Sequence, residues 1–207
     1  MSESSMGKWQ AMTQPPRAVE FFKGLFDRVG VKIIETGEVF TGKHKGDKIE
    51  FASGINEPEV DFTIAITTEQ VDRLTRHVDS GELGTAEEFR IVRTLFTPAT
   101  QATLRNPMMS NGLLRRLNGV EDLIHVHLHS PVDEEEDEHH TLIHAAGQWV
   151  VIPGLHGKPR RVFDLTMADA LEYHRRALDA IHKDSLLNWL SFASWYKKWR
   201  KGVSKLV

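Results

Sequence analysis

Residues 59–81 change from one hydrophobic repeat to another, and the rest of the chain is interpreted around this segment. Apolar and polar residues alternate over 60–67, the pattern of a strand with one buried face. Thr67 and Gln70 then have the spacing of a capping box, which predicts a helix directly after the strand. Gly81 suits the left-handed conformation that ends a helix. The apolar stripe of this helix consists of Val71, Leu74 and Val78.

The preceding residues predict a helix followed by an antiparallel meander. Apolar residues at helical spacing run through 17–29, and Gly30 is expected to stop that helix. Turn residues then separate three short extended segments, at 31–35, 38–43 and 48–52. Residues 1–16 are polar and are expected to form a mobile tail.

After Gly81 the pattern predicts three helical pieces, the second restarting at Pro98 and the third ending near Gly119. A strand-rich part follows, in which a final strand leads into a helix that begins at Thr166 with Asp169. No internal repeat is evident, so we expect residues 17–207 to form one folded unit. The expected later elements are strands at 123–129, twice within 141–152 and at 162–165, and a last helix at 185–202.

The order helix, meander, strand and helix resembles the SCP2 sterol-carrier family. The words that carry the resemblance are EVDFTIAITTEQVDRLTRHVDSGEL, in which Val60–Ile64 match an extended phrase, Val71–Leu74 a helix, and Ser80–Gly81 its end. The match covers residues 17–96. The residues after His129 lie outside the family pattern, and a longer helical insertion precedes the strand at Leu123.

The resemblance implies an α+β fold with a mixed, mostly antiparallel sheet of about five strands, covered by helices around an apolar tunnel. An added hairpin and two C-terminal helices form an extension from about residue 130 to 207. The implied function is non-enzymatic binding or transfer of a lipid, sterol or acyl chain, with no catalytic residue and no cofactor. An apolar cavity needs shape and apolar walls, because burial is worth ~25 cal/mol per Å². The candidate lining residues are Phe62, Ile64, Leu74, Val78, Phe89, Val92, Phe96, Met108 and Met109.

A histidine-rich strand supports a second hypothesis, a metal-dependent enzyme. His125, His127 and His129 share one face of the strand at 123–129, and His144 follows in the next strand. Residues i and i+4 of a strand lie ~13 Å apart, so the three histidines cannot all hold one ion. The other interpretation is a solvent-exposed face of an amphipathic strand.

The C-terminal helix combines aromatic and basic residues, which suits either packing on its own domain or contact with an anionic membrane surface. A third hypothesis is an accessory or scaffold protein that uses this helix on a partner protein. The candidate membrane-contact residues are Trp189, Trp195, Trp199, Lys197, Lys198, Arg200 and Lys201.

Composition narrows these hypotheses. The 207 residues contain no cysteine, which excludes disulfides and thiolate metal sites and fits a reducing, cytoplasmic compartment. The net charge of -3 gives no reason to expect nucleic acid as a partner. The resemblance implies a hydrophobic small molecule or lipid as partner, and the C-terminal helix suggests an anionic membrane surface as a second one.

Overall fold

The chain has an α+β fold with two separate mixed sheets. The computed structural model describes residues 4–75, 84–109 and 122–207. It divides the chain into two compact units, Met1–Pro98 and Ala99–Val207, with a sheet of four strands in the first and of five in the second. This corrects the expected single unit over 17–207 with one sheet of about five strands. The reason is that the later strands pair among themselves and do not extend the first sheet.

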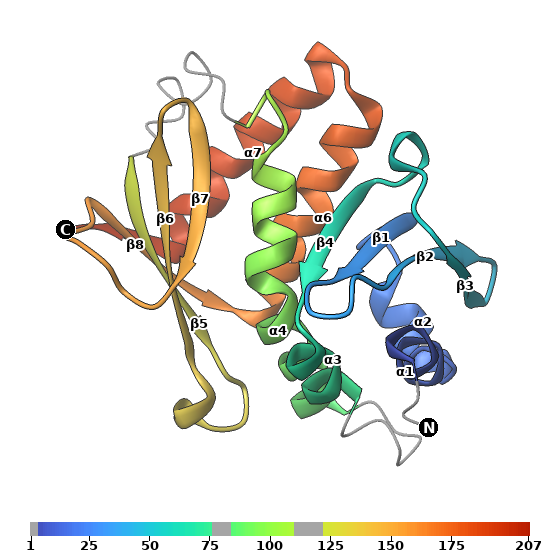
Figure 1. The fold of residues 1–207 in the computed structure, drawn as a ribbon. Helices are drawn as coiled ribbons and strands as arrows, with labels where there is room; N and C mark the ends of the chain where they lie inside the picture. Colours follow the sequence, from blue (N-terminus) through green and yellow to red (C-terminus); the bar gives the residue numbers. More distant parts are fainter. Residues whose placement is uncertain (1–3, 76–83, 110–121) are drawn as a thin grey trace. The chain divides into compact units, whose positions relative to one another are not determined.

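The first sheet has the strand order β3-β2-β1-β4 (Figure 1). Its first three strands form the predicted antiparallel meander, and β4 returns beside β1 in parallel. Turn glycines with positive φ, such as Gly46 at 65°, join the meander strands. The elements are β1 (Arg28–Ile33), β2 (Val39–Lys45), β3 (Lys48–Ser53), the 3-10 helix η1 (Glu57–Glu59) and β4 (Phe62–Ile66).

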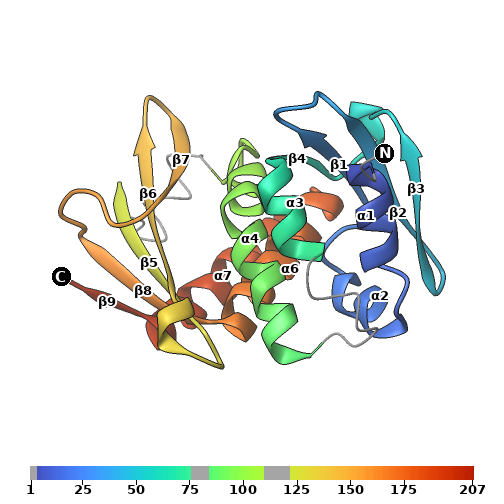
Figure 2. The ribbon, with the colours of Figure 1, turned by 60° about the horizontal axis from the view of Figure 1, so that its bottom comes forward.

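Helices on one face of this sheet bury its apolar side chains, including Val31, Phe40 and Ile64. Trp9 of the first helix is 1% exposed and makes edge contacts with Phe40 and Phe51 at ring-centroid distances of 6.1 and 6.5 Å. The first helix also lies beside the third (Figure 2). The helices are α1 (Ser5–Met12), α2 (Pro16–Phe22), α3 (Thr68–Thr75) and α4 (Thr85–Leu104).

Two expectations for the first unit are therefore wrong. Residues 5–12 form a docked helix and not a mobile tail, because burial of Trp9 and Met12 holds it on the sheet. The helix expected over 17–29 ends at Phe22, since Gly24 turns the chain with a φ of 75° and Val29 already belongs to β1.

The second sheet has the strand order β7-β6-β5-β8-β9. Strands β5, β6 and β7 form an antiparallel meander, β8 runs parallel to β5, and β9 pairs antiparallel with β8. The amide of Gln101 in α4 bonds the outer strand β7, donating to the carbonyl of Trp149 and accepting from the backbone N–H of Val151, each at 2.8 Å. The elements are β5 (Leu123–His129), the 3-10 helix η3 (Glu134–Glu136), β6 (Glu138–Ala145), β7 (Gln148–Pro153), β8 (Arg161–Thr166) and β9 (Ser204–Leu206).

Two long helices, α6 (Met167–Lys183) and α7 (Leu186–Val203), cover one face of the second sheet (Figure 1). The predicted capping box is present, because Thr166 and Asp169 bond each other's backbone N–H groups. Within residues 4–75, 84–109 and 122–207, no helix combines the length and hydrophobicity needed to cross a bilayer.

The two units repeat one topology. Each has a three-stranded meander, a fourth strand parallel to the first, and a helix whose first turn is bonded by a threonine, Thr67 in one unit and Thr166 in the other. The expectation of no internal repeat is therefore wrong. Equivalent core positions hold different side chains, such as Phe40 and His140, and this hides the repeat in the sequence.

Candidate functional site

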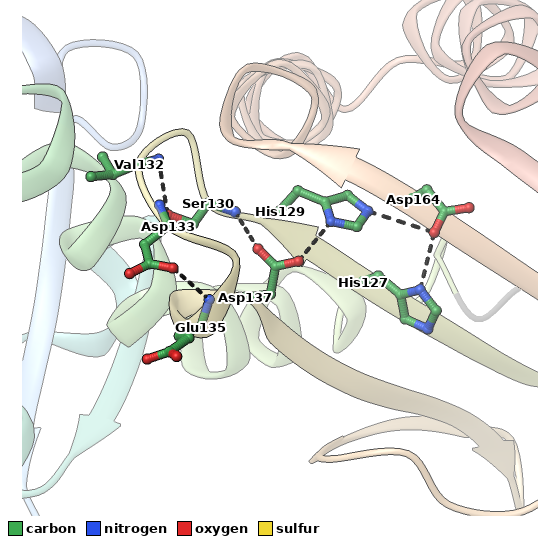
Figure 3. Close-up of polar contacts among 8 residues, drawn as sticks. All are labelled: His127, His129, Ser130, Val132, Asp133, Glu135, Asp137 and Asp164. Atoms are coloured by element: carbon green, nitrogen blue, oxygen red, sulfur yellow. Dashed lines mark hydrogen bonds and ion pairs between the residues drawn. The ribbon is translucent and has the colours of Figure 1, made fainter.

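A network of histidine, carboxylate and lysine side chains lies on the second sheet, on the face opposite the helices. Asp164 is at its centre. Its Oδ1 accepts a hydrogen bond of 3.0 Å from Nδ1 of His127 and lies 3.7 Å from Nε2 of His129 (Figure 3). Its Oδ2 lies 3.1 Å from Nζ of Lys205. We call this group the Asp164 cluster; its members are His127, His129, Asp137, His139, Asp164 and Lys205.

Strand register brings these residues together from four strands. His127 and His129 have the same parity in β5 and therefore point to the same face. The parallel neighbour β8 places Asp164 beside His127, and the antiparallel neighbour β6 places His139 on the other side of it. The imidazole centroids of His127 and His139 are 4.9 Å apart.

Asp137 ties the cluster to the loop between β5 and β6. One carboxylate oxygen accepts a hydrogen bond of 2.7 Å from the backbone N–H of Ser130, and the other lies 2.8 Å from Nδ1 of His129 (Figure 3). The Ser130 hydroxyl accepts in turn from the backbone N–H groups of Val132 and Asp133. His129 is thus held between two carboxylates.

The surroundings favour a neutral His127 beside ionised carboxylates. Burial lowers the pKa of His127, and this outweighs the hydrogen bond and charge of Asp164, which act in the opposite direction. Burial acts to raise the pKa of Asp164, but the hydrogen bonds and charges of Lys205 and His127 bring it below its usual range. Because an ionised Asp164 only accepts hydrogen bonds, the proton of neutral His127 is on Nδ1 and its Nε2 is a free base.

An Asp–His pair of this kind can accept a proton at the unprotonated Nε2, and the lowered pKa of His127 places this below the usual pH range of histidine. The topology that the two units share does not require an Asp–His pair at this position. The positions of His127, His139 and Asp164 are filled by Lys32, Val39 and Ala65 in the first sheet, as the two sets of strand registers show. The Asp164 cluster is therefore a property of the second unit alone.

The predicted metal-ligand set does not come together. His125 is 7% exposed, and its Nε2 bonds the carbonyl of His156 at 3.0 Å. His144 has the opposite parity to Thr141, the register partner of His125, and therefore lies on the other face of the sheet, against Trp149. Among the described residues, no three histidine or acidic side chains are placed to hold one ion. The predicted ligand set is therefore wrong for His144, because the strand register places it on the other face, and for His125, because its buried ring is bonded to a backbone carbonyl.

The predicted cavity-lining residues fall into both units. Ile64, Leu74, Phe89 and Val92 are buried in the first unit, each less than 9% exposed. Phe62 and Phe96 of the same unit are half-buried, as are Met108 and Met109 of the second. Val78 lies outside the described residues.

The aromatic residues of α7 pack within the second unit. Trp189 is 3% exposed and donates from Nε1 to a carboxylate oxygen of Asp184 at 3.2 Å. Trp199 stacks on Phe163 of the sheet and on Tyr173 of α6, at centroid distances of 5.8 and 5.4 Å. Burial raises the pKa of Tyr173. The prediction that Trp189 contacts a membrane is therefore wrong.

Other predicted membrane-contact residues differ in their exposure. Trp195 is half-buried, with the Arg176 guanidinium 5.5 Å from its ring centroid. Arg200 is also half-buried, and its guanidinium lies 6.0 Å from the ring centroid of Tyr196. The exposed residues of this set are Lys197, Lys198 and Lys201.

Sequence reasoning selected His127 and His129, two of the three histidines of the Asp164 cluster, and did not select Asp164 or Lys205. The signal for the repeat was present in two segments, TGKHKGDKIEFASG from Thr41 and TLIHAAGQWVVIPG from Thr141, which share threonine, histidine and glycine at matching positions. Comparison with known proteins adds no relative: no family model, no curated protein and no solved structure matches the chain.

Proposed function

We propose that the protein binds a hydrophobic ligand, a lipid, a sterol or an acyl chain, and does so without catalysis. The observation that supports this is the element order. The helix, meander, strand and capped helix on which the sterol-carrier resemblance rests are all present in the first unit, and the meander, strand and capped helix recur in the second.

The helix-covered face of the first sheet provides the apolar surroundings that such a ligand needs. Phe62 and Ile64 of β4 lie on this face, and α3 and α4 supply Leu74 and Phe89. Arg73 of α3 donates to Thr94 of α4 at 3.2 Å, which holds the two helices together. A ligand among these side chains would gain ~25 cal/mol for each Å² of apolar surface removed from water.

Mass spectrometry of an organic extract of the natively purified protein tests the proposal. We expect an apolar molecule in the extract that is absent after the protein is unfolded, washed and refolded. The refolded protein should then bind a fluorescent acyl probe saturably. A protein that carries no apolar molecule and binds neither acyl nor sterol probes would refute the proposal, and would favour a scaffold role.

Two substitutions in the first unit test whether the ligand binds at the helix-covered face of the sheet. Phe62→Glu puts a charge on the helix-covered face, at a half-buried position, and should abolish probe binding. Ile34→Glu is the matched control, because Ile34 is 58% exposed and has the opposite parity to Ile33 of the core. We expect Ile34→Glu to bind the probe like the wild type, and circular dichroism should show that both variants are folded.

The metal-dependent enzyme is not proposed, because the strand register separates His144 from the other histidines. The Asp164 cluster remains capable of proton transfer, but its chemistry needs no metal.

A further inference from the structure

Helix α7 presents an apolar and basic surface that its own unit leaves uncovered. Leu186, Leu187 and Leu190, in the first two turns, are 70%, 78% and 49% exposed. Trp189, between them in sequence, is buried on the opposite side. Large aliphatic side chains exposed together on one helix mark a binding surface more often than an ordinary solvent face.

The same side of the helix is basic towards its C-terminus. Leu187, Leu190, Lys197 and Lys201 follow one another at spacings that return to one helical face, and both lysines are exposed. Lys198 is exposed beside them. We call these six residues the α7 outer face: Leu186, Leu187, Leu190, Lys197, Lys198 and Lys201.

No acidic residue occurs in α7, so its lysines are not neutralised from within the helix. The nearest acidic residues before the helix are engaged elsewhere. Asp184 accepts the hydrogen bond of Trp189, and Asp179 forms an ion pair of 2.8 Å with Lys183. The α7 outer face thus combines exposed leucines with uncompensated positive charge.

We propose that the α7 outer face docks on an anionic lipid surface. The leucines enter the boundary between head groups and acyl chains, and the lysines meet the lipid phosphates and carboxylates. The charge favours this partner, because a neutral lipid surface gives the three lysines nothing to bind. The inference is independent of the ligand proposed above, since it uses a different surface and requires no cavity.

This placement differs from contact through tryptophan rings. In α7 the rings of Trp189 and Trp199 stabilise the unit from inside, and the leucines on the other side are the residues free to enter a membrane. Substituting the leucines should therefore remove membrane binding without unfolding the helix.

Flotation of the full chain with vesicles tests the docking. One set of vesicles contains phosphatidylcholine alone and the other phosphatidylcholine with phosphatidylserine. We expect the wild type to float only with the anionic vesicles, and less as salt is raised. The triple variant Leu186→Ser, Leu187→Ser, Leu190→Ser should lose on the order of tenfold or more in vesicle affinity.

The lysine variant Lys197→Gln, Lys198→Gln, Lys201→Gln should also lose binding to the anionic vesicles. Its matched control is Lys43→Gln, Lys45→Gln, Lys48→Gln, which removes the same charge from β2 and β3 and should float like the wild type. The apolar control is Val132→Ser with Leu155→Ser, two residues 59% and 48% exposed elsewhere in the second unit. Circular dichroism should show that every variant is folded.

A dye attached at one position shows directly whether the α7 outer face enters the membrane. The chain has no cysteine, so Leu187→Cys can carry a single polarity-sensitive dye, with Leu155→Cys as the control site. Anionic vesicles should shift the dye emission to the blue at position 187 and leave it unchanged at 155. The proposal is overturned if the wild type binds no vesicles, if the leucine variant floats like the wild type, or if the dye at 187 stays in water. If the α7 outer face bound only an acidic protein, the dye at position 187 would stay in water when vesicles are added.

Discussion

Thr41 and Thr141 occupy the same position in the two sheets, and each donates a hydrogen bond of 2.8 Å to the carbonyl oxygen of a glycine thirteen residues later. In both units this bond ties the second strand of the meander to the start of the loop that leads to the fourth strand. The acceptors, Gly54 and Gly154, have φ values of 91° and 84°, which favour glycine. A shared detail of this kind indicates that the units repeat a local structure and not only a strand order.

Replacing Thr141 with valine should destabilise the second unit more than the equivalent change at Thr41 destabilises the first. Thr141 is fully buried and also accepts a hydrogen bond of 2.9 Å from the backbone N–H of His156, so valine leaves two backbone groups, this N–H and the Gly154 carbonyl, without this partner. We expect a loss of about 1–3 kcal/mol in the free energy of unfolding for Thr141→Val. Chemical denaturation, with hydrogen exchange as the signal for each unit, measures the free energy of unfolding of both variants.

Tryptophan fluorescence gives a simpler measurement for Thr141→Val, because four of the five tryptophans belong to the second unit and only Trp9 to the first. Equal losses in the free energy of unfolding for Thr41→Val and Thr141→Val would contradict the interpretation that the hydrogen bond from the His156 backbone N–H stabilises the second unit.

Gly30 lies in β1 at a point where the loop after β3 approaches the sheet closely. A Cβ at this position would lie 2.7 Å from Oγ1 of Thr63 and 3.1 Å from Cγ2 of Ile55. Gly30→Ala should therefore destabilise the first unit by about 1–3 kcal/mol, the usual cost of overpacking. Thermal unfolding followed by circular dichroism measures the loss.

Gly202 provides the opposite case. It lies in α7, and a Cβ there would have no neighbour within 4 Å. Gly202→Ala should stabilise the helix by up to about 1 kcal/mol, because glycine is a poor helix former. If both alanine variants shift the unfolding temperature in the same direction, the packing argument for Gly30 does not hold.

Local structure was largely predictable from the sequence, and pairing between distant strands was not. The alternation before Thr67, the meander turns and the capping box at Thr166 each depend on a few neighbouring residues, and each predicted element is present. The division into two sheets depends on which strands pair, and hydrophobic alternation carries no information on the partner of a strand. Trp9 shows the same limit, because it is buried against Phe40 and Phe51 of the sheet, and the polar sequence around it does not predict that contact.

The candidate site follows the same division. The shared face of His127 and His129 could be predicted from parity within one strand. Their partner Asp164 could not, because it depends on the register between parallel strands far apart in the sequence, and Lys205 lies in β9, a strand of three residues. The sequence could not predict on which face of the sheet His144 lies, because this too depends on the register between strands.

Replacing Asp164 with asparagine should lower the pKa of His127 further. Among the residues that the structure describes, Asp164 alone acts to raise this pKa against burial and the neighbouring histidines, through its hydrogen bond and its charge. Titration of the imidazole resonances by NMR measures the shift. Asp137→Asn is the matched control, because Asp137 bonds His129 and is not among the groups that move the pKa of His127. A pKa of His127 that stays the same or rises in Asp164→Asn would contradict the assigned hydrogen bond.

His140 makes the stability of the second unit depend on pH. It is 2% exposed and has the position that Phe40 has in the first unit, on the helix-covered face of the sheet. Burial lowers its pKa from 6.5 to about 4, an effect that the charge of Glu138 opposes and that of His139 adds to. The folded unit therefore resists protonation of a side chain that the unfolded chain protonates readily.

The sign follows from proton binding in the two states. Above pH 6.5 both states leave this histidine neutral, and it contributes no pH dependence. As the pH falls from 6.5 to about 4, only the unfolded state binds the proton, so the free energy of unfolding decreases, by about 3 kcal/mol at the lower end. Below that pH both states are protonated and the loss is complete.

His140→Phe should remove this component, since phenylalanine does not titrate and already fills the equivalent position in the first unit. Urea unfolding followed by tryptophan fluorescence between pH 7 and 4.5 gives the two stability curves. We expect the curve of the variant to be flatter, so that the difference in stability between variant and wild type grows in favour of the variant as the pH falls. His140→Leu serves as a second variant if the larger ring disturbs packing. Parallel curves over this range would mean that His140 is protonated in the folded state as readily as in the unfolded chain, and that its burial does not control its charge.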